Sequence, residues 1–170
     1  MHYTLAILLS LFHRQAVTRG FLCVLATLTC QSVGAAEVQI TQLADIDFGR
    51  VPPTVSEVRS AANFCVALEP QGRFNIIATG DGPGGSFLLQ QSGGVGAISY
   101  TVTVSDRGRG RGRLVQAGVP LGGLRALSPR PNGACSQPFG TVTAMIDGRA
   151  LRAARPGFYR GTLNLLVAPE

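Results

Sequence analysis

The sequence predicts an all-β fold arranged as an antiparallel β-sandwich. Its 22 glycines and 10 prolines interrupt the chain at short intervals. The segments between them are β-branched, aromatic or alternately apolar and polar, which is the pattern of a half-buried strand. Almost no segment repeats its apolar residues with the period of a helix. Six to eight short strands at this spacing are typical of a sandwich.

Eight segments are predicted to be strands, because each combines β-forming residues with turn residues at its ends. In chain order they are Val38–Asp47, Asn63–Leu68, Arg73–Ala78, Ser86–Leu89, Ile98–Val104, Leu114–Val115, Val142–Ile146 and Gly161–Val167. Turns are predicted at Pro52-Pro53, Gly80–Gly85, Gly93-Gly94 and Pro129–Gly133. The clearest alternation places Ile98, Tyr100, Val102 and Val104 on one face.

The last of these strands follows a turn at Pro156-Gly157. Its apolar residues stand at odd positions, namely Tyr159, Leu163, Leu165 and Val167. No further strand follows it in the sequence to form a hairpin. An uncovered edge strand with an apolar face is prone to aggregate. We therefore expect another strand to cover this edge.

The beginning of the chain resembles a secretory leader. The apolar run Phe21–Cys30 is preceded by Arg14 and Arg19 and followed by the small residues Val33–Ala36. A membrane-spanning helix needs about 20 apolar residues, and this run is shorter. We expect a signal peptide over residues 1–35, with cleavage after Ala35 or Ala36. Residues 36–170 would then form a single exported domain without a transmembrane segment.

Cleavage would leave two cysteines, Cys65 and Cys135. Two cysteines in an exported domain predict one disulfide, and two free buried thiols are the alternative. In the chain-entropy model a disulfide that closes a loop of this size stabilises the fold by about 4 kcal/mol. An oxidising compartment would therefore be part of the folding requirement.

The residues that remain after cleavage exclude most catalytic chemistry. They contain no histidine and no lysine, which excludes histidine-dependent triads, imidazole metal sites and Schiff-base chemistry. Asp45 and Asp47 could act as a hydrolase carboxylate pair, but their alternation with Ile46 and Phe48 is explained by one apolar and one polar face. The glycines of Gly80–Gly85 predict a hairpin turn and not a phosphate loop. We expect neither an enzyme nor a cofactor or metal.

All the remaining positive charge is arginine. Thirteen arginines and nine carboxylates give residues 36–170 a net charge of +4. Four of these arginines alternate with glycine in one short run, at Arg107, Arg109, Arg111 and Arg113. The run carries no aromatic residue for base stacking, so it predicts a cationic hairpin loop and makes nucleic acid an unlikely partner. Its arginines are candidates for contact with an anionic surface.

An ordered series of motifs resembles a known family. It comprises Asp47-Phe48-Gly49, Phe64-Cys65-Val66, Arg73–Ile76 leading to Ala78–Gly80, Ile98–Val102, the second cysteine Cys135 and the closing Gly157–Leu163. In this order the motifs resemble the spore coat protein U domain, a pilin-like family of archaic chaperone–usher systems. The resemblance spans nearly all of residues 36–170.

The resemblance implies an immunoglobulin-like sandwich that lacks its final strand. A periplasmic chaperone lends a strand to the open groove of such subunits, and the N-terminal extension of the next subunit replaces it during assembly at an outer-membrane usher. The implied groove residues are Tyr159, Leu163, Leu165 and Val167. The implied location is the periplasm in transit, then the surface or pilus of a Gram-negative bacterium.

The N-terminal segment departs from the family pattern. Val38 and Ile40 alternate as a donor strand should, but Gln42 breaks the alternation. The segment is too short to serve both as donor and as first core strand. If it is a core strand, the subunit can accept a strand and not donate one, and it would cap a fibre or stand at its tip. The alternative function is a self-contained secreted adhesin that binds a surface glycan or other anionic ligand through the Arg107–Arg113 loop.

Overall fold

The computed structural model describes residues 37–41, 43–106, 111–127, 135 and 139–170. These residues belong to one compact unit that spans Gly34–Glu170. The predicted leader and its cleavage points lie outside the described residues. Within the described part of the chain, no helix is long and apolar enough to cross a membrane.

The described residues are almost entirely β-structure, so the predicted fold class is confirmed. The strands are β1 Glu37–Thr41, β2 Glu57–Glu69, β3 Arg73–Thr79, β4 Leu88–Gln91, β5 Ala97–Ser99, β6 Thr101–Ser105, β7 Arg113–Val115, β8 Leu121–Arg125, β9 Gly140–Asp147, β10 Tyr159–Arg160 and β11 Asn164–Pro169. One short helix, α1, covers Gly148–Ala153, and a single 3-10 turn covers Pro83–Gly85. All pairings between these strands are antiparallel.

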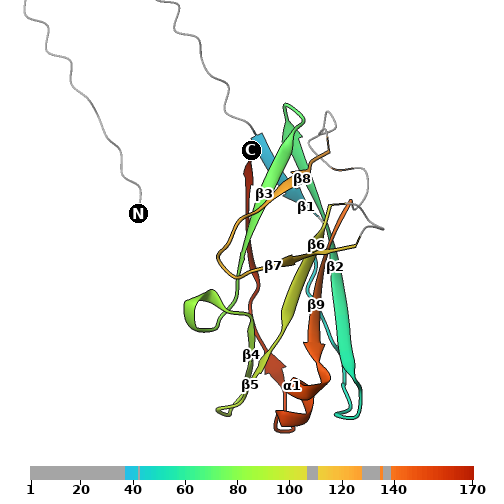
Figure 1. Ribbon diagram of the computed structural model, residues 1–170, viewed down its shortest axis with the longest axis vertical. Coiled ribbons are helices and arrows are strands. Elements are labelled where there is room, and N and C mark those ends of the chain that lie inside the picture. Colours follow the sequence, from blue (N-terminus) through green and yellow to red (C-terminus); the bar gives the residue numbers. More distant parts are fainter. Residues whose placement is uncertain (1–36, 42, 107–110, 128–134, 136–138) are drawn as a thin grey trace, which may run out of the picture. The chain divides into compact units, whose positions relative to one another are not determined.

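The strands form three sheets. The largest has the order β1-β2-β9-β6-β7, and the two smaller sheets have the orders β11-β3-β8 and β10-β4-β5. Figure 1 shows β3 and β11 on one side of the domain, with β2, β6 and β9 on the other. One apolar cluster joins the sheets, with Phe64, Val102 and Val142 from the large sheet and Phe74 and Ile76 from the β3 sheet. The core therefore lies between the layers of a sandwich.

The predicted first strand is shorter than expected. β1 ends at Thr41, and residues 43–49 are not part of any sheet. Asp47 ends the extended segment with a local turn, because its carboxylate accepts the Gly49 N–H at 2.8 Å. The Ser60 hydroxyl donates to the Asp47 carbonyl at 2.5 Å and ties the segment to β2. The predicted extension of this strand to Asp47 is therefore wrong.

The single strand predicted over Ile98–Val104 is divided in the structure. Its first part, β5, pairs with β4, and its second part, β6, pairs with β7 and β9. The break is at Tyr100, whose N–H donates to the Phe87 carbonyl at 3.1 Å and whose ring centroid lies 5.6 Å from that of Phe87. The chain thus changes sheets while the predicted apolar face stays buried throughout.

The predicted last strand, Gly161–Val167, starts three residues later than expected, and Tyr159 lies on a separate strand. β10 pairs with β4, whereas β11 begins only at Asn164 and pairs with β3. At Gly161 the chain passes close to β4, because a Cβ at this position would lie 2.6 Å from the Leu88 carbonyl oxygen. The Thr162 N–H donates to the Asp81 carboxylate at 2.6 Å. Residues 161–163 therefore carry the chain from one sheet to another.

Three features are absent from the sequence predictions. β2 begins at Glu57, six residues before the predicted start at Asn63, and β8 contains two consecutive glycines that conceal its strand pattern. α1 is capped at its N-terminus by Asp147, whose carboxylate accepts the Arg149 N–H at 2.7 Å. The Gly80–Gly85 turn is also not a hairpin, since β3 and β4 belong to different sheets.

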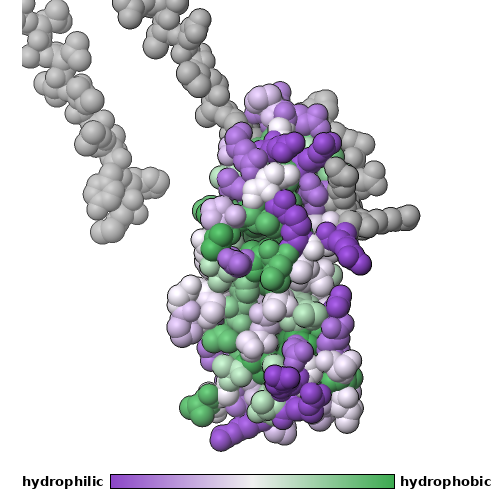
Figure 2. Space-filling model, in the orientation of Figure 1, coloured by the Kyte–Doolittle hydropathy of each residue, from purple (hydrophilic) through white to green (hydrophobic). Residues whose placement is uncertain are grey.

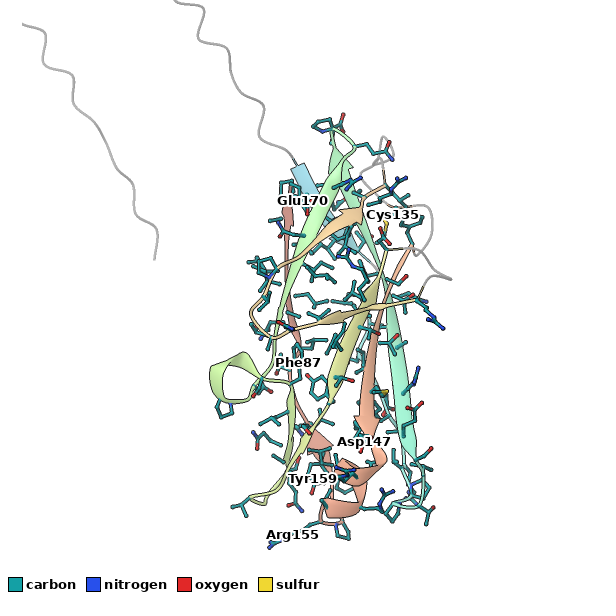
Figure 3. All side chains as sticks on the ribbon, in the orientation of Figure 1. Phe87, Cys135, Asp147, Arg155, Tyr159 and Glu170 are labelled. Carbon is teal, nitrogen blue, oxygen red and sulfur yellow. A yellow bond between two sulfur atoms is a disulfide. The ribbon has the colours of Figure 1, made fainter. Side chains whose placement is uncertain are left out.

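Cys65 and Cys135 form a disulfide, with their Cα atoms 6.2 Å apart. The bond joins β2 to the segment that precedes β9, and Figure 3 places Cys135 at the end of the domain that also holds Glu170. Ala67 and Leu127 pack around it in a small apolar cluster separate from the main core. The Leu127 backbone pairs with β2 on both sides of Ala67, through bonds of 2.9 Å and 3.0 Å with Val66 and Leu68.

Candidate functional site: the open edge of the sandwich

The candidate site is the seam between two edge strands, which we define as β1 together with β11. β1 is the end strand of the large sheet and β11 is the end strand of the β3 sheet. The two strands approach each other without pairing, and Figure 1 shows the end of β11 beside β1. The sandwich is therefore open along this line.

The backbone of β11 presents unpaired groups to the seam. The Glu170 N–H donates to the Arg73 carbonyl at 3.0 Å, directly opposite it in the register of β11 with β3. Hydrogen-bonded pairs alternate along an antiparallel ladder, so Ala168 and Leu166 also bond to β3. The N–H and C=O groups of Leu165 and Val167 then point away from β3. They form the free hydrogen-bonding edge of the sheet.

The side chains of β11 divide between core and solvent. Leu165 and Val167 are half-buried and pack against the main core, whereas Leu166 between them is 63% exposed. Pro169 has no N–H to donate and belongs to the residues whose backbone faces the seam, as expected of proline on an edge strand. A strand placed along the seam would find backbone partners at Leu165 and Val167 and an apolar floor beneath them.

The other side of the seam is formed by β1, which pairs with Cys65–Glu69 of β2 in its own domain. Val38 is half-buried against the core, and Ile40 is 41% exposed. The Thr41 hydroxyl is buried and has no hydrogen-bond partner among the described residues. Val38 and Ile40 thus belong to a strand that is part of this chain's own sandwich.

The four predicted groove residues do not lie on one strand. Leu165 and Val167 are on β11, and Leu163 precedes it and also packs against the core. Tyr159 is on β10, in a different sheet, and its hydroxyl donates to the Arg155 carbonyl at 2.8 Å. Figure 3 shows Tyr159 near α1, distant from Glu170 at the end of β11. The seam therefore has Leu165 and Val167 on its β11 side and Val38 and Ile40 on its β1 side.

The predicted cationic loop lies only partly within the described residues. β6 and β7 form an antiparallel hairpin around it, and Arg107 and Arg109 lie outside the described residues. Arg111 and Arg113 are exposed and line a cavity of about 300 Å³. Arg113 belongs to β7, and its guanidinium donates to the Gly122 carbonyl of β8. Sequence reasoning missed the contribution of β8, because only the pairing of distant strands brings it here.

Burial raises the pKa of the Tyr100 hydroxyl, and the nearby Asp81 charge raises it further. Tyr100 is part of the core. Asp45 and Asp47 are exposed. In the described ranges, no three histidine, cysteine or carboxylate residues are grouped to hold a metal ion.

Comparison with solved structures finds a likeness to a fimbrial protein. No family model and no curated protein matches the sequence. A chain in a solved structure of the chaperone–tip adhesin complex of CFA/I fimbriae superposes with a TM-score of 0.57 and 14% sequence identity. The match covers 78% of this chain and 41% of that one, so this chain spans less than half the length of its structural neighbour. At this identity the likeness establishes the sandwich fold.

Proposed function

We propose that this protein is an exported structural subunit of a chaperone–usher pilus and that it is completed by a strand from another chain. One observation carries the proposal. Two edge strands from different sheets approach each other unpaired, and β11 presents both free backbone groups and half-buried apolar side chains there. Strand addition uses backbone hydrogen bonds for affinity and alternating side-chain contacts for specificity.

The proposal is supported from two further directions. The order of sequence motifs resembles the spore coat protein U family, and the structural neighbour is a component of a complex between a chaperone and a tip adhesin. The proposed partners are a periplasmic chaperone, an outer-membrane usher and neighbouring subunits. The proposed role is structural and involves no catalysis.

Within the fibre, we propose that this subunit accepts a strand and does not donate one. Val38 and Ile40 belong to β1, which pairs with β2 of the same domain over all five of its residues. Releasing β1 for donation would remove the edge strand of the large sheet and uncover the part of the core against which Val38 packs. A subunit of this kind would stand at the tip of a fibre or end it.

A covalently attached strand tests the proposal. Residues 36–170 are extended at the C-terminus by a short turn and a strand in which valine alternates with threonine. The control extension has the same composition, with its valines and threonines in two blocks, so that its apolar residues no longer alternate. We expect the alternating extension to raise the melting temperature and to yield a monomer, whereas the control leaves the protein aggregation-prone.

Co-expression gives the complementary test. The unextended protein should be recovered in greater yield, and as a heterodimer, when a fimbrial periplasmic chaperone is produced with it. If the unextended chain is already a stable soluble monomer, and neither the chaperone nor the alternating extension changes it, the proposed function is wrong.

A second candidate function is a self-contained adhesin for an anionic ligand. It is favoured by the cavity beside Arg111 and Arg113, which is separate from the seam and would be available with or without strand addition.

A further inference from the structure

Four arginines gather where β3, β7 and β8 meet, and we call them the arginine cluster. Its members are Arg73, Arg111, Arg113 and Arg125. All four are exposed, and they come from three separate parts of the chain. Figure 2 shows hydrophilic side chains over the end of the domain that carries β8, and others at the opposite end. The cluster lies partly on the cationic loop and partly on strands that sequence reasoning did not associate with it.

Two members of the cluster face each other across a strand pair. Arg73 of β3 and Arg125 of β8 are direct partners in the register. The Ala126 N–H donates to the Gly72 carbonyl at 3.1 Å, so the hydrogen-bonded position is the adjacent one. Arg73 and Arg125 therefore occupy a non-hydrogen-bonded pair, where opposite side chains are closest. Like charges at such a position destabilise a sheet.

A third member approaches from the other sheet. The Arg113 guanidinium donates to the Gly122 carbonyl. Its Nη1 atom and the Nη1 atom of Arg73 each lie 3.9 Å from the point that a Cβ on Gly123 would occupy. Gly123 has a φ of +73°, which favours glycine, so this surface stays free of a side chain. Two guanidiniums from different sheets thus converge above one backbone position.

The carboxylates near the cluster already have backbone partners. The Asp106 carboxylate accepts the Arg125 N–H at 2.8 Å, and the Glu170 carboxylate accepts the Gly123 N–H at 2.6 Å. Within the described residues, the single ion pair closer than 4.0 Å joins Arg59 to Glu57, away from the cluster. The four guanidiniums are therefore not neutralised by direct pairing with described carboxylates.

We propose that the arginine cluster binds an acidic saccharide, with one carboxylate or sulfate group held between the guanidiniums of Arg73 and Arg113. The planar fork of arginine suits two-point binding of such oxyanions. The adjoining cavity of about 300 Å³, lined by Asp106, Arg111 and Arg113, is at the small end of ligand pockets and suits a single sugar unit. Local conflicts such as the Arg73–Arg125 pair are expected at functional positions.

The proposal is tested by binding to immobilised polysaccharides. Heparin presents sulfate groups, a polyuronate presents carboxylates, and dextran is the neutral control. The test variant is Arg73→Gln with Arg113→Gln, in which glutamine keeps an N–H donor for the Gly122 carbonyl. The matched control is Arg149→Gln with Arg152→Gln on α1, which removes the same charge from exposed positions.

We expect the test variant to bind heparin, the polyuronate or both about tenfold more weakly than the wild type, because two charge-assisted hydrogen bonds are lost. The control variant should bind within about twofold of wild type. The more affected polysaccharide identifies the oxyanion. Equal losses of affinity in both variants would show that net charge alone drives binding, and would overturn the proposal. Undiminished binding by the test variant would also overturn it.

Thermal melting separates a lost site from a lost fold. Arg73→Gln alone should melt at or above the wild-type temperature, because it relieves the like-charge pair with Arg125. Inorganic sulfate should raise the melting temperature of the wild type more than that of this variant. A lower melting temperature with an unchanged sulfate response would overturn the proposal. The alternating extension should stabilise the test variant as it does the wild type, so this site and the seam can fail independently.

Discussion

At the residue scale, the sandwich depends on places where a side chain is missing. Gly140 on β9 is buried directly opposite Phe64 on β2, and a Cβ on Gly140 would overlap the Phe64 ring. An aromatic ring lying across a glycine of the neighbouring strand fills the space that the glycine leaves. This contact joins β2 and β9, which are neighbouring inner strands of the large sheet.

Gly140→Ala should therefore destabilise the fold by about 1–3 kcal/mol, because the added methyl forces the Phe64 ring out of a packed core. Urea unfolding measures the change. Gly72→Ala is the matched control, since a Cβ there would meet nothing closer than the Pro70 carbonyl oxygen at 3.8 Å and the backbone is not left-handed. Equal midpoints for the two variants would show that the Phe64 contact carries no packing energy.

The Tyr100 hydroxyl makes stability depend on pH in the alkaline range. Burial raises its pKa above the ordinary tyrosine value of 10.0, so the folded state retains a proton that the unfolded chain releases. The resulting stability is complete below about pH 10 and is lost as the pH rises further. Urea midpoints should fall as the pH rises above about 10, and Tyr100→Phe should reduce this fall. An unchanged slope in Tyr100→Phe would contradict the assignment.

At the scale of elements, the sequence predicted the strands whose side chains alternate. It did not predict the strand bounds and sheet memberships that depend on contacts between strands. β3 and the buried face of β5 and β6 agree with the prediction, because alternation alone specifies which residues are buried. β8 was missed because its two glycines carry no side-chain pattern. The changes of sheet at Tyr100 and Gly161 were missed because alternation continues through both. Only the Phe87 and Leu88 contacts reveal them.

The disulfide fixes the large sheet to the segment before β9. It closes a loop with a sequence separation of 70 residues. Replacing both cysteines by alanine should lower the free energy of unfolding by about 4 kcal/mol, since the unfolded chain regains the freedom of that loop. A reducing agent should produce a similar loss in the wild type and no loss in the variant. A reducing agent that leaves the wild-type midpoint unchanged would contradict this account.

Along β11, odd and even residues should have different roles in strand addition. Leu165→Ser and Val167→Ser should each reduce the rise in melting temperature produced by the alternating extension, because these side chains form the apolar floor of the seam. Leu166→Ser should leave the rise intact, since Leu166 is 63% exposed on the opposite face. If Leu166→Ser reduces the rise as much as the other two substitutions, the added strand is not lying along the seam.

At the scale of the whole molecule, the sequence indicated that the last strand has an edge in need of a partner. It did not indicate which other strand lies beside that edge. Alternation identified Leu165 and Val167, and the resemblance to pilin-like subunits gave them a role. The facing strand β1 could not be placed there, because its neighbours depend on the assembly of both sheets. For the same reason the sequence indicated only two members of the arginine cluster, Arg111 and Arg113 of the cationic loop. Arg73 and Arg125 reach it through strand register.

Amide hydrogen exchange tests the central claim, that β11 has one paired and one free edge, most directly. In the unextended protein the N–H groups of Leu166 and Ala168 should be protected by β3, and those of Leu165 and Val167 should exchange rapidly. Adding the alternating extension or a bound chaperone should protect Leu165 and Val167 and leave the other two unchanged. The account would be contradicted if the N–H groups of Leu165 and Val167 were already protected in the unextended protein. It would also be contradicted if they remained unprotected after strand addition.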